Sequence, residues 1–177
     1  MVASIKGNKL NKGEWAEFYV MLKLLGEGRL YTADKLLRKN YRSFLDVLKI
    51  IRQECESYKL EYIVDKENSL VKIKPSDSET VLAEIPTRDF MYYSKRLFDG
   101  IQNETGASVS APDDVCDFAK VIYVSKPKAP AVKSLEKQFG GKNDIFVDNF
   151  SWGYISSFCF PFYFCSMKAG GSPPANR

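Results

Sequence analysis

The most regular pattern of apolar and polar positions lies between residues 13 and 25. Four apolar side chains recur at the spacing i, i+3, i+4, i+7, which is typical of one face of an amphipathic helix: Trp15, Phe18, Tyr19 and Leu22. Asn11 precedes the pattern and is a good N-cap, while the run Gly26-Glu27-Gly28 is a helix stop signal. We therefore predict a first helix that begins near Gly13.

Three further segments show helical spacing. Residues 41–57 predict a second helix with an apolar face formed by Phe44, Val47, Leu48 and Ile51. Pro86 and Thr87 open a third helix, whose inward side chains are Phe90, Leu97 and Ile101. Residues 113–119 predict a short helix.

Short apolar runs bounded by turn residues predict strands. Residues 60–64 and 70–73 predict a hairpin, because the polar turn 65–68 separates them. The remaining predicted strands are residues 30–33, 80–85, 121–124 and 145–147. Together these elements predict one α/β domain over residues 1–177, with helices in residues 1–60 and a small mixed β-sheet in residues 61–177.

Length and composition fit a single domain of ordinary content. The chain has 177 residues, of which 45% are hydrophobic and 27% charged. The formal net charge of +4 permits a nucleic-acid partner without requiring one. The cysteines form no C-x-x-C pair, which excludes a zinc finger and favours reduced thiols in a cytoplasmic protein: Cys55, Cys116, Cys159 and Cys165. We expect no signal peptide and no membrane span.

The sequence contains no histidine, which restricts the chemistry that it can perform. Mechanisms that use a Ser-His-Asp triad, a Cys-His pair or a histidine-bound metal are excluded. A nuclease built from this sequence must use carboxylates, lysine and a hard cation.

The candidate chemistry lies in residues 140–170. Asp144 opens the apolar run 145–147, and Lys168 ends an aromatic run about twenty residues later. An acidic oxygen can hold a hard cation, and an ammonium can stabilise charge that develops on a phosphate. Ser166 and Lys168 lie two residues apart and face the same side of a strand. We therefore predict two neighbouring strands that carry a carboxylate and a lysine.

The first helix offers a second carboxylate. Glu14 and Glu17 lie three residues apart and share a stripe of that helix. One interpretation is structural, since the helix dipole favours acidic residues in the first turn. The other is that Glu17, or less favourably Glu14, supplies a metal ligand.

Several segments resemble HpaII-type restriction endonucleases. The opening NKGEWAEFYVMLKLL (residues 11–25), followed by GRLYTAD (residues 28–34), is similar to the start of that family. GKNDI (residues 141–145) resembles the approach to its catalytic aspartate. CSMK (residues 165–168) resembles its Phe-Ser-Ile-Lys segment, and GGSPP (residues 170–174) resembles the glycine-rich stretch that follows.

The resemblance implies a type II restriction endonuclease with a PD-(D/E)XK fold, in which a restriction-endonuclease-like core carries the site. The implied substrate is double-stranded DNA at a short palindrome such as CCGG, and the implied cofactor is Mg2+. It also implies that Asp144 binds the metal, that Lys168 stabilises the phosphate, that Ser166 stands where the second acid usually lies, and that Glu17 lies near the metal. A palindromic target favours a homodimer.

The sequence also departs from the family pattern. Family members are about twice as long, and residues 156–165 are unusually aromatic with a proline inside. We expect a truncated core that cuts DNA poorly when taken alone.

A competing hypothesis is a non-catalytic DNA-binding or structural fragment. It would touch phosphates through the series Lys126, Lys128, Lys133, Lys137 and Lys142. A third and weaker hypothesis places residues 152–164 at a membrane interface.

Overall fold

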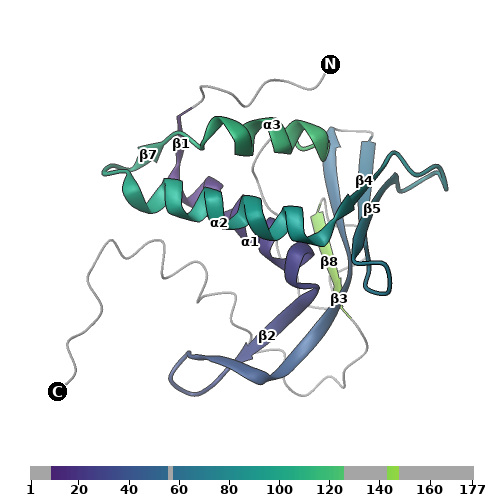
Figure 1. The fold of residues 1–177 in the computed structure, drawn as a ribbon, viewed down its shortest axis with the longest axis horizontal. Coiled ribbons are helices and arrows are strands. Elements are labelled where there is room, and N and C mark those ends of the chain that lie inside the picture. The colour runs from purple at the N-terminus through teal and green to yellow at the C-terminus, as the bar shows by residue number, and fades with distance from the viewer. Residues whose placement is uncertain (1–8, 56–57, 126–142, 148–177) are drawn as a thin grey trace.

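The computed structural model describes residues 9–55, 58–125 and 143–147. In the described residues, helices α1 (Lys12–Glu27), α2 (Thr87–Asn103) and α3 (Asp113–Val121) pack beside a β-sheet (Figure 1). The strands are β1 (Leu10–Asn11), β2 (Arg29–Ala33), β3 (Lys39–Cys55), β4 (Tyr58–Asp65), β5 (Leu70–Pro75), β6 (Ala83–Pro86), β7 (Ser108–Val109) and β8 (Asn143–Val147). The α/β class predicted from the sequence is confirmed.

The main sheet is organised around the long strand β3. Its strand order is β2-β3-β4-β5-β6, with β8 also paired to β3, and every pairing in the described residues is antiparallel. Both β4 and β8 pair with residues 49–52 of β3, so these two strands lie on its opposite edges. Since β2 and β4 flank β3 in the sheet order, β2 and β8 follow one another along the same edge.

Helix α1 begins and ends where the sequence predicts. Asn11 is the N-cap and forms a capping box with Glu14: the Glu14 N–H donates to Asn11 Oδ1 at 2.8 Å, and the Asn11 N–H donates to Glu14 Oε2 at 3.3 Å. Gly28 is the C-cap, with a φ of 61° that glycine adopts without steric cost. The buried residues Trp15, Phe18 and Leu22 confirm the predicted inward face.

Helices α1 and α2 approach each other at a glycine. A Cβ atom added at Gly26 would lie 2.7 Å from Met91 Cγ and 2.9 Å from the Met91 backbone nitrogen. Real Cβ atoms do not come this close to backbone atoms, so residue 26 must lack a side chain for the two helices to pack in this way. The inward face predicted for α2 is confirmed, because Phe90, Leu97 and Ile101 are all buried.

Two aromatic side chains in the core use their polar atoms to fix distant segments. Trp15 Nε1 donates to the Val109 carbonyl oxygen at 3.0 Å, and the Tyr62 hydroxyl donates to the Ile122 carbonyl oxygen at 2.9 Å. Buried polar groups are costly unless they are hydrogen-bonded, so each bond selects one placement of the loop that it reaches. The first bond ties α1 to β7, and the second ties β4 to the end of α3.

The predicted helix over residues 41–57 is wrong. Residues 39–55 form strand β3, which buries Val47 and Ile50 and leaves Phe44 and Leu48 partly exposed. The predicted strand over residues 121–124 is also wrong, since α3 continues to Val121 and a turn follows. The 60–64/70–73 hairpin, the strand near residues 30–33 and the helix after Asp113 are confirmed.

No helix in the described ranges has the length and apolar character needed to cross a bilayer.

Removal of the Tyr62 hydroxyl tests the tie between β4 and α3. We expect Tyr62→Phe to lower the free energy of unfolding by about 1–2 kcal/mol, because the Ile122 carbonyl loses its buried donor. Tyr92→Phe is the matched control, since that side chain is exposed. Urea unfolding of both variants gives the comparison, and equal midpoints for the two variants would contradict the expectation.

Candidate active site

The sheet has one buried face and one polar face. Ile50 on β3 and Tyr62 on β4 are fully buried and are register partners. Because side chains alternate along a strand, Lys49 and Glu61 lie on the opposite face. We call this second surface the polar sheet face, and its charged members on β3 to β6 are Lys49, Lys59, Glu61, Asp65, Lys72, Lys74 and Glu84.

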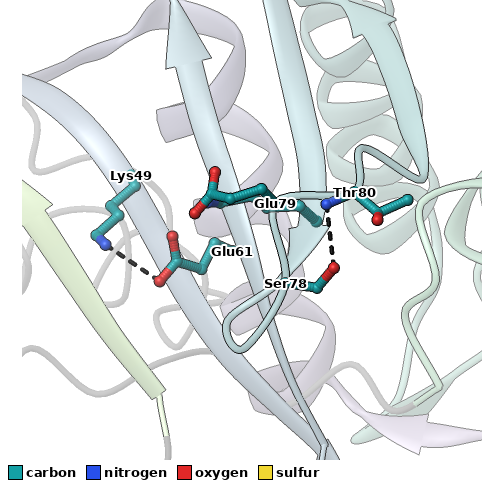
Figure 2. A network of polar contacts seen from close by, with 6 residues as sticks. Lys49, Glu61, Ser78, Glu79 and Thr80 are labelled. Carbon is teal, nitrogen blue, oxygen red and sulfur yellow. Dashed lines mark hydrogen bonds and ion pairs between the residues drawn. The ribbon is translucent and has the colours of Figure 1, made fainter.

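Three lysines of the polar sheet face form ion pairs, two of them across strands and one with the turn after β5. Lys49 Nζ lies 3.1 Å from Glu61 Oε1, as Figure 2 shows, and both side chains are half-buried. Lys72 Nζ lies 2.8 Å from Asp65 Oδ2, and Lys74 Nζ lies 2.8 Å from Glu79 Oε2. Oppositely charged cross-strand pairs stabilise a sheet by fractions of a kcal/mol each and fix its register.

Beyond β5, a turn brings Glu79 back over this face. The Thr80 N–H donates to Ser78 Oγ at 3.1 Å, which holds the turn (Figure 2). Lys74 Nζ donates to the carboxylate of Glu79. Glu79 remains largely solvent-exposed, whereas the Lys74 side chain is mostly covered. The Lys74 ammonium lowers the pKa of Glu79 below its ordinary value.

The backbone of Asp144 lies next to this face. Asp144 is the second residue of β8, which confirms the predicted strand at residues 145–147. It pairs with Ile51, and Ile51 pairs on its other edge with Glu61. The register therefore sets Asp144, Ile51 and Glu61 in one row across three strands, two residues along β3 from Lys49. The side chains of β8 lie outside what the structure describes.

Glu14 and Glu17 have different surroundings. Glu14 closes the capping box described above, as the structural interpretation of that residue predicts. Glu17 is half-buried on α1, which packs against the buried face, where Arg52 Nη1 lies 3.1 Å from Met21 Sδ. Ile51, the partner of Asp144, belongs to the other face. The prediction that Glu17 and Asp144 share a metal ion stays a prediction.

The remaining predicted site residues fall outside the described ranges. Ser166 and Lys168 belong to this group, as does the basic series from Lys126 to Lys142. Among the side chains that the structure describes, in residues 9–53 and 59–125, no group of three acidic residues or cysteines could hold a metal ion.

Two charged residues beside Asp144 were missed by the sequence analysis. Lys49 was assigned to a helix, so its position opposite β4 could not be foreseen, and Glu61 was treated only as part of a hairpin. The available signal was the alternation of Lys49, Ile51 and Gln53 with Ile50 and Arg52, which has the period of two that a strand requires.

The fold is consistent with a restriction-endonuclease-like core. It combines helices with an antiparallel sheet, and Asp144 lies on β8 next to the longest strand, β3. The comparison with protein families identifies the group, since the model of the HpaII restriction endonuclease family matches residues 11–155. The chain belongs to this family.

One curated relative supports the same assignment. Over 112 residues the chain is 29% identical to the type II restriction enzyme HpaII of Haemophilus parainfluenzae. The matched region covers 63% of this chain and 30% of that enzyme, so the chain aligns with less than a third of its relative. No solved structure matches significantly.

The Asp65–Lys72 pair predicts an acid-sensitive contribution to stability. Hydrogen bonds from Lys72 and then from Asn68 lower the pKa of Asp65 to about 2. A carboxyl group whose pKa is lowered in the folded state stabilises the protein above its ordinary pKa of 3.8. That contribution is lost as the pH falls from about 4 through about 2.

We therefore expect Asp65→Asn to weaken the dependence of the free energy of unfolding on pH in this window. Urea unfolding between pH 2 and pH 5 measures it, with the exposed Asp77→Asn as control. Parallel curves for the wild type and Asp65→Asn would count against the ion pair.

Proposed function

We propose that this chain carries the nuclease centre of a type II restriction endonuclease, which hydrolyses phosphodiester bonds of double-stranded DNA at a short palindrome such as CCGG. The observation that carries the proposal is the family match over residues 11–155, which includes Asp144. The position of Asp144 on β8, paired with the long strand β3, agrees with it. The match ends before Ser166 and Lys168, so their roles rest on the sequence resemblance alone.

The available side chains fit a hard divalent cation in type. Carboxylate oxygens are the ligands that Mg2+ prefers, and a chain without histidine offers no competing imidazole site. When bound, Mg2+ lowers the pKa of a bound water and neutralises charge on the scissile phosphate. In this proposal Asp144 is the first carboxylate ligand, and Glu17, on the helix that covers the opposite face of the sheet, is the candidate for the second that the experiments below test.

The other site residues have separate tasks. Lys168 stabilises the negative charge that develops on the phosphate, and Ser166 occupies the position at which a second acid is usual. A palindromic target suits a homodimer, because each protomer then meets the same half-site. A cytoplasmic location is part of the proposal and rests on the cysteine argument from the sequence.

Loss of the Asp144 carboxylate tests the metal site directly. We expect Asp144→Asn to weaken Ca2+ binding, measured by calorimetry, and to lower Mg2+-dependent plasmid nicking by about 100-fold or more. Asp99→Asn, an exposed carboxylate on α2, is the matched control. Equal Ca2+ affinity in wild type and Asp144→Asn would refute the assignment and favour a DNA-binding fragment without a metal centre.

The same Ca2+-binding assay distinguishes the roles of the two helix carboxylates, Glu14 and Glu17. We expect Glu17→Gln to weaken Ca2+ binding and Glu14→Ala to leave it unchanged while lowering the free energy of unfolding by about 1 kcal/mol, since only Glu14 closes the capping box and alanine has no acceptor for the Asn11 N–H. If the Glu14 substitution weakens Ca2+ binding and the Glu17 substitution does not, Glu14 and not Glu17 is the helix ligand.

A further inference from the structure

Strand β2, the following turn and the first half of β3 form a two-stranded ribbon, which we define as residues 29–45. Arg29 pairs with Asp46 and Ala33 with Lys39, so the ribbon extends over the whole of β2. Figure 1 shows it projecting from the sheet, away from α2 and α3. At about 3.3 Å per residue, its five-residue strand is about 16 Å long.

One side of the ribbon is attached to the protein body and the other carries aromatic rings. Leu30 is buried in the core, and Leu45 packs against it. The neighbouring residue Tyr31 instead contacts two rings, with centroid distances of 5.8 Å to Tyr41 and 5.7 Å to Phe44. Tyr41 is 72% exposed, so this aromatic cluster faces solvent at its outer end.

Two cations lie on these rings. The guanidinium carbon of Arg29 is 4.3 Å from the centroid of Phe44, and Lys39 Nζ is 3.9 Å from that of Tyr31. Lys39 Nζ also lies 3.5 Å from Glu27 Oε2. A cation held over an aromatic ring loses less conformational freedom when it meets an anion. The aromatic cluster therefore orders Arg29 and Lys39 in advance.

The ribbon concentrates the positive charge of the protein. Residues 29–42 contain one acidic residue, Asp34, and five basic residues: Arg29, Lys35, Arg38, Lys39 and Arg42. Their net charge of +4 equals the formal charge of the whole chain. Within the described residues, Asp34 pairs with Arg38 at 2.8 Å, and no carboxylate lies within ion-pair distance of Arg29, Lys35 or Arg42.

The tip of the ribbon is held in one conformation. Asp34 Oδ1 accepts hydrogen bonds from the N–H groups of Leu36 and Arg38, at 2.8 Å and 2.9 Å. These bonds support Leu37 at a φ of 59°, which is unfavourable for leucine. The hydrogen bonds from Arg38 also lower the pKa of Asp34. Lys35 is therefore presented from an ordered turn.

We infer that the ribbon is a second contact surface for double-stranded DNA, in which Arg29, Lys35 and Arg42 bind backbone phosphates away from the nuclease centre. The inference rests on the proposed function, since that function supplies the DNA. A two-stranded β-ribbon fits the major groove of B-DNA, and phosphate contacts of this kind position a protein on the duplex. A protein partner fits less well, because the cores of protein interfaces are depleted in charged residues.

The test removes two of these cations and measures salt-dependent binding. Lys35→Gln/Arg42→Gln is the ribbon variant, because both side chains are exposed and neither forms a side-chain hydrogen bond or ion pair within the described residues. Lys95→Gln/Arg88→Gln, two exposed positions on α2, is the matched control. Fluorescence anisotropy with a 20-base-pair duplex containing CCGG, in EDTA and between 50 and 300 mM salt, gives affinity and its salt dependence without requiring cleavage.

We expect the ribbon variant to bind roughly tenfold or more weakly at about 0.1 M salt, and its slope of log K against log salt to become shallower by about 1.8, which corresponds to two phosphate contacts. The α2 control should keep the wild-type slope. Equal slopes for wild type and ribbon variant would overturn this inference and leave the nuclease proposal intact. Absence of DNA binding by the wild-type chain would overturn both.

The alternative occupant of the ribbon surface is a second copy of the chain. Sedimentation of the same variants tests for it. We expect wild type and ribbon variant to sediment identically. A change of oligomeric state in the ribbon variant, with unchanged DNA affinity, would show instead that the ribbon joins two copies of the chain.

Discussion

The continuous hydrogen bonding of strand β3 is the constraint on which the described structure depends. A buried strand must satisfy its backbone N–H and C=O groups on both edges, and residues 49–52 of β3 do so with β4 on one edge and β8 on the other. Within the described residues, the part of β3 from Lys39 to Asp46 pairs with β2 along one edge only. The change from β2 to β8 falls near Val47, where the pairing with β8 shifts register and where the Val47 N–H donates to the Gly28 carbonyl. The β2–β3 ribbon and the backbone of Asp144 are thereby placed along one edge of a single strand.

This arrangement connects the two surfaces that we assign to DNA. The ribbon occupies residues 39–45 of β3, and the polar sheet face begins at Lys49. Under these two proposals, a duplex that contacts the ribbon would be directed along β3 toward the row formed by Asp144, Ile51 and Glu61. Phosphate contacts at a distance from the reacting bond are a common way to position DNA without reading its sequence. In this molecule they would set the orientation of the duplex at the nuclease centre.

The sequence predicts the elements whose signals are local. The capping residue Asn11, the stop at Gly28 and the hairpin turn after Asp65 all act over a few residues, and the structure has each of them. The failure at residues 41–57 has a tertiary cause. Phe44, Val47, Leu48 and Ile51 match a helical period, and a strand of 17 residues is much longer than usual.

Pairing with three neighbouring strands overrides that local pattern, and a single sequence does not reveal those neighbours. The same limit applies to the candidate site. Asp144 could be singled out from its place before an apolar run, whereas Glu61 and Lys49 approach it through strand register alone. Val121 and Ile122 show the converse case, since their β-branched side chains suggest a strand but the end of α3 and the bond from Tyr62 determine their conformation.

The close approach of α1 and α2 at Gly26 has a consequence for the mechanics of the molecule. Only Glu27 separates that contact from Gly28, whose left-handed backbone turns the chain directly into β2. A Cβ atom at Gly28 would already touch Val64 at 3.4 Å. The ribbon therefore leaves the protein body from a tightly packed turn and not from a flexible one. The packing of α1 against α2 sets the direction of the ribbon. A side chain at Gly26 would therefore change the orientation of the charged ribbon, although most of its residues lie far from Gly26 in the sequence.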